Sequence, residues 1–249
     1  MKLAAEGVSM IAATVREPFL QQIFHNYDRQ IWTHKELIII VNDNAISLAP
    51  YMQKALDYPN VSVFRVDEGK NLGACLNYGV AQAKFNYIAK LDDDDYYSPY
   101  YLTEAMQQFS SSDADIVGKR SCYFYFPHRS KLLFRRTAVR ANSRCKKIAG
   151  ATIMFHRNVF EKVQFPTKVI QGSDVRFIRA CLANGFRLYT TSRYNFVAFR
   201  RKDPRSHTWK VNDYQLLSSK GAIIIRTTNF NKHIMKPFHI VPSGIASKS

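Results

Sequence analysis

The stretch Tyr87-Ile88-Ala89-Lys90-Leu91-Asp92-Asp93-Asp94-Asp95-Tyr96 places four adjacent carboxylates directly after a short apolar run. The apolar run is typical of a buried strand, and helix-like sequence begins after Ser98-Pro99. Adjacent like charges repel, so a fold tolerates them best where a cation or hydrogen-bond donors neutralise them. In an extended chain Asp92 and Asp94 point to the same side, at the strand end where α/β sheets bind ligands, and could hold Mg²⁺ or Mn²⁺. A solvated acidic turn is the alternative.

Strands and helices are expected to alternate around this stretch. Apolar runs at 8–13, 37–41, 61–66 and 87–91 predict strands, with helical segments between them. A strand about every 25 residues is typical of βαβ units and a mostly parallel sheet. Polar residues follow each strand, so a nucleotide could lie across the strand ends. The chain has neither a Gly-x-Gly-x-x-Gly motif nor a phosphate-loop motif.

The second half of the chain is more basic and less regular. Residues 116–160 include no Asp or Glu, and aromatic residues are interleaved with the basic ones. This pattern fits nucleic-acid or sugar recognition, or a strand pair with one solvated face. The apolar run 148–155 predicts a further buried strand, and Ser173 is expected to cap an amphipathic helix that ends at Asn184-Gly185. Residues from 220 onward could not be placed.

Composition limits the possible partners and compartment. The 249 residues include 36 Lys and Arg against 19 Asp and Glu, a formal net charge of +17. Such a chain attracts anions, including nucleic acids, nucleotide phosphates, acidic polymers and anionic membrane surfaces. Cys75, Cys122, Cys145 and Cys181 lack zinc-ligand or redox spacing, so we expect reduced, mostly buried thiols, as in a cytoplasmic protein. No apolar run approaches a membrane span or a secretory signal, so any membrane contact is expected to be peripheral.

Taken together, these motifs resemble the family-2 inverting glycosyltransferases, which have the nucleotide-sugar-binding GT-A fold. The resemblance covers roughly Val8 to Trp209, with the motifs in the family's order. Thr14 and Arg16 match the family's Pro-Thr-Tyr-Asn-Arg opening, although its proline and tyrosine are replaced. Asp43 matches the aspartate that holds the uracil ring, and Asn42 departs from the preceding aspartate, which leaves the identity of the base open.

The acidic run itself resembles the family's Asp-x-Asp-Asp metal motif. The resemblance implies that Asp94 contacts the metal directly, and that Asp92 contacts it through water or binds the ribose or the sugar. Asn71-Leu72-Gly73 through Asn77 resembles the segment that precedes this motif, and Lys70 would add positive charge near the phosphates. The residues that the resemblance assigns to the donor are Thr14, Arg16, Asp43, Lys70, Asn77, Asp92, Asp93, Arg201 and Arg205.

Two later motifs complete the expected site. Ser173-Asp174 resembles the family's Glu-Asp pair at a helix start, with Ser173 in place of the glutamate, so Asp174 is the expected general base. The basic segment 200–209 resembles a loop that closes over the diphosphate, in which His207 would bind the metal or donate to a phosphate. Structural alternatives remain for several of these side chains: helix capping by Asp43 or Asp174, a solvated Lys70, and a surface His207.

The resemblance implies an α/β fold with a mostly parallel, Rossmann-like central sheet, helices on both faces and a small acceptor-side extension. One domain is expected over 1–215, with a nucleotide-binding half at 8–110 and an acceptor-side half at 111–215. Residues 216–249 are expected to form an appendage or tail.

The implied activity is that of a hexosyltransferase-like enzyme of the cytoplasm, dependent on Mn²⁺ or Mg²⁺. It would move a sugar from a nucleoside-diphosphate sugar, with UDP favoured, to a hydroxyl of a saccharide or polyol in cell-envelope or surface polysaccharide synthesis. The basic charge suggests an anionic acceptor or contact with the inner face of a membrane. No specific nucleic acid is expected as a partner.

Three other functions stay open from the sequence. A basic nucleic-acid-binding protein fits the charge and the aromatic residues but does not explain the acidic run. A nucleotidyltransferase for sugar phosphates would carry a glycine-rich loop where this chain has 12–16, without glycine. A domain that binds a nucleotide sugar without turnover fits the departures at Asn42 and Ser173.

Overall fold

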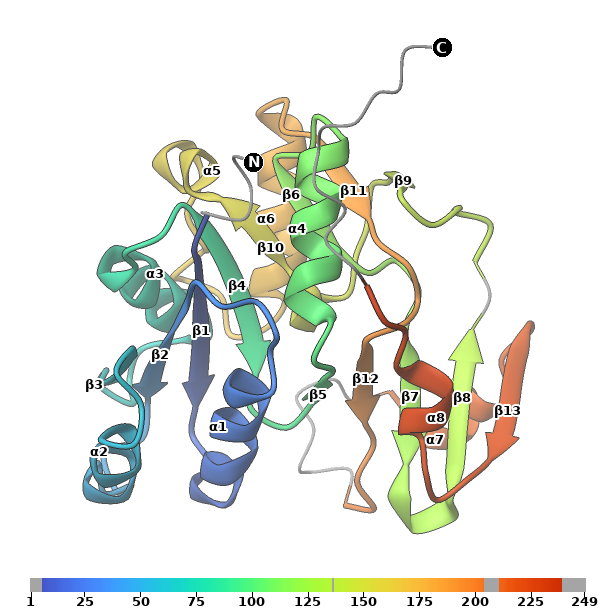
Figure 1. Ribbon diagram of the computed structural model, residues 1–249, viewed down its shortest axis with the longest axis horizontal. Coiled ribbons are helices and arrows are strands. Elements are labelled where there is room, and N and C mark those ends of the chain that lie inside the picture. Colours follow the sequence, from blue (N-terminus) through green and yellow to red (C-terminus); the bar gives the residue numbers. More distant parts are fainter. Residues whose placement is uncertain (1–5, 136, 204–210, 239–249) are drawn as a thin grey trace.

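The computed structural model describes residues 6–135, 137–203 and 211–238. Within these residues, eight strands form the larger sheet, and the first four are parallel neighbours whose carboxyl ends meet at one edge (Figure 1). In sheet order the strands are β3 (Val61–Arg65), β2 (Lys35–Val41), β1 (Val8–Thr14), β4 (Tyr87–Asp92), β10 (Met154–His156), β6 (Ile116–Gly118), β11 (Leu188–Thr190) and β9 (Ser143–Arg144). The mainly parallel sheet expected from the first half of the sequence is confirmed.

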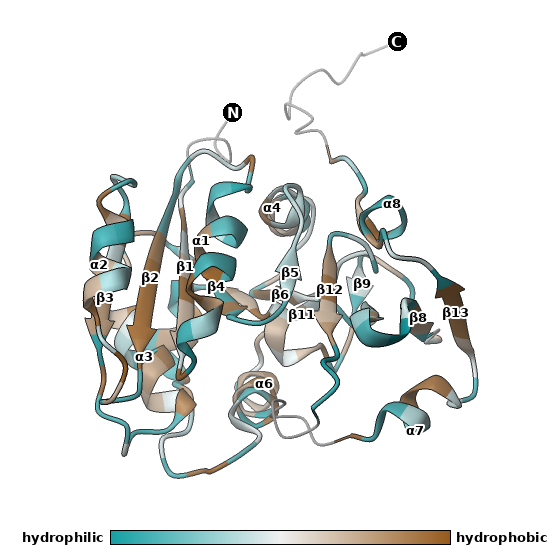
Figure 2. Ribbon diagram, turned by 90° about the horizontal axis from the view of Figure 1, so that it is seen from below, coloured by the Kyte–Doolittle hydropathy of each residue, from teal (hydrophilic) through white to brown (hydrophobic). Residues whose placement is uncertain are grey.

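Helices cover both faces of this sheet, as predicted (Figure 2). One apolar cluster joins the sheet to α1, α2 and α4 through side chains such as Phe24, Tyr51 and Met106. A second cluster joins the opposite face to α3, α5 and α6, with Leu76 and Phe177 among its members. The helices concerned are α1 (Leu20–Asp28), α2 (Ala49–Ala55), α3 (Leu72–Gln82), α4 (Tyr101–Ser111), α5 (Arg157–Lys162) and α6 (Ser173–Ala183).

Two local predictions in the second half are wrong. The run 148–155 is not one strand, because a 3₁₀ turn, η4 (Gly150–Thr152), interrupts it and only β10 is extended. The chain bends there because Ala149 N donates to Lys119 O at 2.8 Å. This hydrogen bond directs the backbone before η4 away from the direction of β10. Ser173 does not cap α6: Gly172 holds the cap position with a φ of 77°, a left-handed conformation that favours glycine.

A second sheet packs beside the first and contains the basic, aromatic segment. Among the described residues its order is β13 (Ala222–Arg226), β8 (Lys131–Arg135), β7 (Tyr123–Phe126), β12 (Phe196–Phe199) and β5 (Tyr96–Tyr97). Phe126 and Phe134 are buried in this unit, so these rings form a core and not an exposed recognition surface. The domain boundary at 215 stays a prediction, although β13 and the buried Ile234 place later residues in this sheet and its core.

The remaining expectations concern thiols and membranes. All four cysteines lie in the described ranges and are free, and Cys145 is only partly buried. Among the described residues, no helix combines the length and the apolar character needed to cross a bilayer.

Candidate active site

The middle of the acidic run is tied to the end of β1. Thr14 Oγ1 donates to Asp93 Oδ2 at 2.6 Å, and Arg16 Nε donates to the same oxygen at 3.2 Å. Arg16 Nη1 donates to Asp94 Oδ2 at 3.1 Å, and Arg201 Nη2 donates to that oxygen at 2.5 Å. Five of the predicted site residues, from three separate segments of the sequence, therefore meet in one group.

Burial and the two arginines set the charge of the run. Burial raises the pKa of Asp94, but the positive charges of Arg16 and Arg201 outweigh this effect and hold it below the ordinary value of a carboxyl. Burial raises the pKa of Asp93, and Arg16 offsets only part of the rise. Burial, together with the charge of Asp94, raises the pKa of Asp95 well above the ordinary value. Asp94 is therefore the carboxylate of the run most firmly held as an anion.

Asp92 and Asp174, predicted from separate motifs, meet at one lysine. Lys90 Nζ donates to Asp92 Oδ1 and lies 3.3 Å from Asp174 Oδ2. Side chains alternate along a strand, so Ile88, Lys90 and Asp92 share the face of β4 that α6 covers, and Asp174 is the second residue of α6. Burial lowers the pKa of Lys90, but the charges of Asp174 and Asp92 outweigh it and raise the pKa above that of an ordinary lysine.

The turn η4 completes the frame around these two carboxylates. Asp92 N donates to Tyr97 Oη at 2.8 Å, and Tyr97 Oη donates to Ala151 O at 2.6 Å. At Gly150, a Cβ would lie 2.2 Å from Asp174 Oδ2, so the lack of a side chain gives that carboxylate its space. The same turn thus fixes the end of β4 and receives Asp174.

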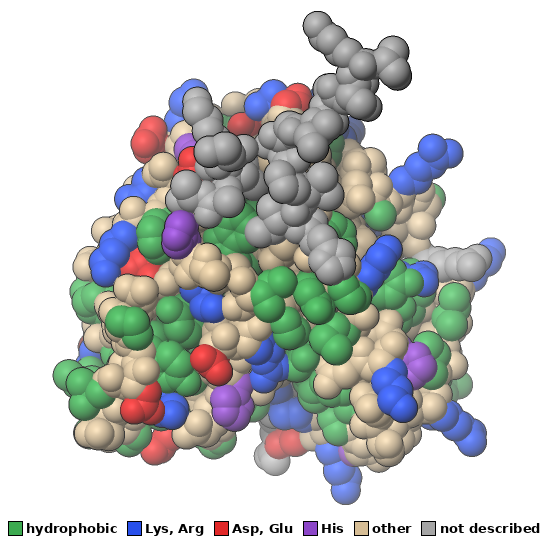
Figure 3. Space-filling model, in the orientation of Figure 1, with side chains coloured by type: hydrophobic (Ala, Val, Ile, Leu, Met, Phe, Trp, Pro, Cys, Tyr) green, Lys and Arg blue, Asp and Glu red, His purple; other side chains and the backbone are tan. Residues whose placement is uncertain are grey.

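Positive charge collects at this edge of the sheet. In the space-filling view, Lys and Arg side chains gather around a recess at the lower middle of the molecule, close to where β4 ends, with acidic side chains among them (Figure 3). Two guanidinium groups, of Arg16 and Arg201, lie 4.6 and 4.9 Å from the centre of the Phe19 ring. A cationic recess beside an acidic run suits a diphosphate bound with a divalent cation.

Asp43 lies in the turn after β2. Its Oδ1 accepts a hydrogen bond from Ala45 N at 2.8 Å, which closes a short turn. Helix α2 begins only at Ala49, with Leu48 at its cap position, so the helix-capping alternative for Asp43 is wrong. The turn leaves Asp43 partly exposed at the carboxyl edge of the sheet.

Two other predicted donor residues are not joined to the acidic run. Asn77 donates to Phe165 O and accepts from Phe165 N, both at 2.9 Å, so its amide fastens α3 to the chain before α6. Lys70 is exposed and lines a groove of about 780 Å³, together with Lys168. No ion pair or hydrogen bond between described residues connects Lys70 with the acidic run.

No sequence motif predicts a role for Lys90, Tyr97, Gly150 or Phe19. The signal for Lys90 was present: a lone lysine inside an apolar strand needs a buried anion as partner. For the other three, sequence offered no comparable signal, because their roles depend on which segments meet in the fold.

The carboxylates of the run fit a divalent cation of the expected kind. Among the described residues, no group of three or more His, Cys, Asp or Glu could hold a metal ion. Mg²⁺ is usually bound by one or two carboxylates, with water and substrate phosphates in the other positions, and Mn²⁺ favours the same oxygen ligands. Asp92 and Asp94 would supply the carboxylates for such a site. The predicted ligand His207 and the predicted phosphate contact Arg205 lie outside the described residues.

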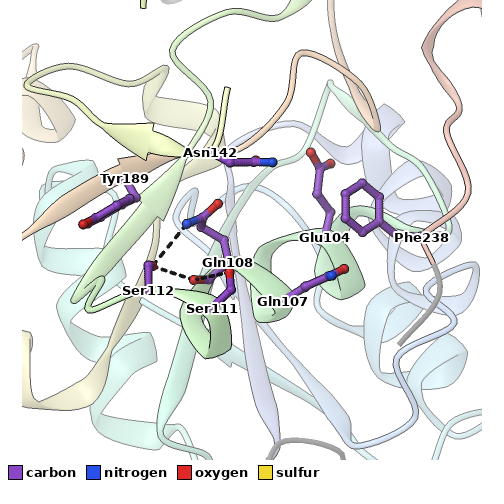
Figure 4. A pocket seen from close by; sticks show the side chains of 8 residues that line it. All are labelled: Glu104, Gln107, Gln108, Ser111, Ser112, Asn142, Tyr189 and Phe238. Carbon is purple, nitrogen blue, oxygen red and sulfur yellow. Dashed lines mark hydrogen bonds between the residues drawn. The ribbon is translucent and has the colours of Figure 1, made fainter. Parts of the chain in front are cut away.

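A second hollow, of about 310 Å³, lies beside α4 away from these groups (Figure 4). Its acidic member, Glu104, is bonded to Lys119 at 2.9 Å and to Asn195 at 3.0 Å. The other lining groups are amides, hydroxyls and rings, which supply no general base. The residues that line it are Glu104, Gln107, Gln108, Ser111, Ser112, Asn142, Tyr189 and Phe238. The acidic run therefore remains the candidate active site.

Comparison with known proteins identifies the family and supports the fold. The pattern of the family described as "Glycosyl transferase family 2" matches residues 10–164. The "Uncharacterized glycosyltransferase YwdF" of Bacillus subtilis (strain 168) is 35% identical over 118 residues, which are 44% of this chain and 42% of that protein. The chain thus spans less than half of this curated relative.

Two solved structures share the architecture. S. aureus TarS 1-349 in complex with UDP-GlcNAc has a TM-score of 0.63 at 14% identity, over 79% of this chain and 59% of that one. Mannosyltransferase PcManGT from Pyrobaculum calidifontis, in complex with GDP-Man and Mn²⁺, has a TM-score of 0.61 at 19% identity, over 85% and 62%. At these identities the likeness shows the GT-A fold alone. With the family pattern spanning more than half of its residues, the chain belongs to glycosyl transferase family 2.

Proposed function

We propose that this chain transfers a sugar from a nucleoside-diphosphate sugar, with UDP favoured, to an acceptor hydroxyl and inverts the anomeric centre. One observation carries the proposal: Lys90 brings Asp92 of the acidic run and Asp174 of α6 together at the carboxyl edge of the parallel strands. Ligands of open α/β sheets bind at this edge. The complexes of TarS with UDP-GlcNAc and of PcManGT with GDP-Man and Mn²⁺ support a donor of this chemical class.

The donor's diphosphate would lie over the ends of β1 and β4. Arg16 and Arg201 converge on Asp94, which places two positive charges where the phosphate oxygens would lie. Asp94 and Asp92 would hold Mn²⁺ or Mg²⁺, which supplies positive charge that stabilises a departing diphosphate. Asp43, at the same edge, is the proposed contact to the base ring.

Asp174 is the proposed general base. Its Oδ2 faces Lys90, whereas its Oδ1 accepts no hydrogen bond from the residues that the structure describes. The acceptor oxygen would bond to the anomeric carbon as the bond to the diphosphate oxygen breaks. The hydroxyl proton passes to the Asp174 carboxylate, and the diphosphate leaves with the electron pair. Attack from the face opposite the leaving group inverts the anomeric centre in one step.

The acceptor is proposed to be a saccharide or polyol of the cell envelope or surface, used on the cytoplasmic side. The net charge of +17 favours an acceptor that carries phosphate or carboxylate groups, or a binding site next to an anionic membrane. Steep weakening of acceptor binding by salt would support this assignment, and salt-independent binding would contradict it.

Two substitutions separate donor binding from chemistry. Asp94→Ala should abolish metal-dependent donor binding, because it removes the carboxylate most firmly held as an anion. Asp174→Asn should leave donor binding largely intact while turnover falls by about 10²–10⁴-fold, the usual contribution of a general base. Calorimetric titration with UDP-sugars and an assay of nucleoside-diphosphate release measure the two properties. Near-normal turnover of Asp174→Asn would show that the base is another residue.

A matched control is Asp57→Asn. Asp57 is an exposed carboxylate just after α2 and pairs with Lys54 at 2.7 Å. The substitution should change neither property. A second candidate function, donor binding without turnover, is favoured by Ser173 in the place of the family's glutamate. The same experiment decides it, because the wild-type chain would then bind donor and release no diphosphate.

A further inference from the structure

We propose that Lys90 is a positioning residue that holds Asp174 against the end of β4 for proton transfer. The inference rests on the proposed function, because it assigns a role within the same site. The ammonium group of Lys90 contacts both Asp92, in the acidic run, and Asp174, at the start of α6.

The location of Lys90 is unusual for a lysine. The residue is only 2% exposed, in the interior of the central strand β4. Its backbone is fixed as well, since Lys90 N donates to Ile153 O at 2.9 Å, just beyond η4. A buried ammonium is tolerated only where anions and hydrogen bonds compensate the lost water, so Lys90 and the two carboxylates hold one another in place.

Asp174 has little other support. The backbone of Gly150 lies close to it on one side, since a Cβ added at Gly150 would lie 2.2 Å from Asp174 Oδ2. Within the described chain, Lys90 is the polar partner of Oδ2, and Oδ1 has none. The Asp174 side chain is 22% exposed, so without the ammonium group it could turn outward to water. Lys90 thus orients the partly exposed carboxylate through its Oδ2 atom.

The alternative is that Lys90 has a purely structural role, and Lys119 is an example of such a lysine in the same chain. Lys119 is also buried and pairs with Glu104, but it donates in addition to Thr191 Oγ1 and Ser192 O, both at 3.0 Å. Lys90 has no such additional acceptors among the described residues. Its two partners are the two carboxylates assigned to the reaction.

The test measures Lys90→Met in the full chain with UDP-GlcNAc, UDP-glucose and GDP-mannose, each with Mn²⁺. Donor hydrolysis, in which water replaces the acceptor, needs no knowledge of that acceptor. We expect kcat to fall on the order of 100-fold, since a misplaced reacting group has an effect of this size, with donor Kd and KM within about twofold. Unchanged kcat, or a change confined to KM, would overturn the proposal.

Two further variants keep the outcome clear. Lys84→Met removes an exposed lysine that lies 3.8 Å from Glu36 and should leave kcat and KM unchanged. If Lys90→Met does not fold, Lys90→Arg takes its place: it keeps the charge but not the single-atom contact with both carboxylates. We expect lower kcat with unchanged donor affinity, and wild-type kcat in Lys90→Arg would overturn the proposal.

A structural measurement separates this inference from the proposed function. If the wild-type chain neither binds nor hydrolyses any of the three donors, the proposed function fails. A crystal structure of Lys90→Met still decides the positioning role. Asp174 turned away from β4 would support the role, and Asp174 unmoved beside Gly150 would refute it.

Discussion

Two buried lysines, each paired with carboxylate, stand in contrasting surroundings. Glu104 on α4 accepts from Lys119 Nζ at 2.9 Å, from Asn195 Nδ2 at 3.0 Å, and from the amide and hydroxyl of Ser192 at 2.8 and 2.5 Å. Both partners of this pair have side chains only 1% exposed. Around Lys90, by contrast, the side chains of Asp92 and Asp174 are 36% and 22% exposed.

The contrast distinguishes an ion pair that stabilises the fold from one that, as proposed, serves the reaction. A closed network in which every donor and acceptor is used rigidifies a core, and the Glu104 pair joins α4 to the chain between β11 and β12. A network whose carboxylates are partly exposed, as those of Asp92 and Asp174 are, leaves capacity for a ligand. The same pair of residue types therefore serves packing in one place and, as proposed, chemistry in the other.

The largest expected effect breaks the closed pair. Lys119→Met leaves the Glu104 carboxylate buried without its cation, which should lower the free energy of unfolding by about 3–5 kcal/mol. Urea denaturation measures this loss, with Lys84→Met as a control expected to stay within about 1 kcal/mol of wild type. A small loss in Lys119→Met would mean that Ser192 and Asn195 suffice to hold the carboxylate.

Lys90→Met should be less destabilising, by about 1–3 kcal/mol, because Asp92 and Asp174 can both reach water after the ammonium group is lost. The same denaturation experiment compares the two lysines directly. If Lys90→Met loses as much free energy of unfolding as Lys119→Met, Lys90 stabilises the fold in the same way as Lys119, and the contrast between the two lysines is weakened.

Gly150→Ala tests the position of Asp174 without changing either lysine. The added methyl group must displace Asp174, so we expect about 1–2 kcal/mol of overpacking and, at unchanged donor affinity, turnover reduced by about tenfold. Gly69→Ala is a suitable control, because its methyl group would meet only the carboxylate end of Asp67, at 2.9 Å. Full turnover in Gly150→Ala would indicate that the Asp174 position is not critical.

The smallest effect concerns pH. Because the pKa of Asp94 is lower in the folded chain than in an unfolded one, the unfolded state binds more protons as the pH falls below about 4. Asp94 therefore contributes stability above its unfolded pKa, and this contribution is lost as the pH falls through the folded value. Denaturation from pH 5 to pH 2 should show a shallower decline for Asp94→Asn than for wild type. Parallel profiles would mean that Arg16 and Arg201 do not hold the carboxylate.

The sequence was sufficient for much of the fold, because the pattern of apolar residues is local. The runs at 37–41 and 87–91 predicted strands of a mostly parallel sheet, and the acidic run at a strand end indicated the ligand edge. The prediction of one strand over 148–155 was wrong because the apolar composition of this run does not reveal the bend at η4, where Ala149 N donates to Lys119 O.

The site was only partly predictable for a related reason. Asp94 and Asp174 were found through motifs, which record the residue type at a position in a sequence. The importance of Lys90 depends on Asp174, which is distant in the chain and reaches Lys90 only when α6 packs on the sheet. Asn77 matched a motif as well, but its amide is used by Phe165, a contact that no spacing rule indicates.

The most direct measurement is a thermal-shift screen of UDP, GDP and their sugars, each with and without Mn²⁺, on wild type and Asp94→Ala. We predict that at least one nucleoside diphosphate and its sugar raise the melting temperature of wild type in the presence of Mn²⁺, and that Asp94→Ala does not respond. If no nucleotide stabilises the wild-type chain, or if Asp94→Ala responds equally, the acidic run is not a donor site.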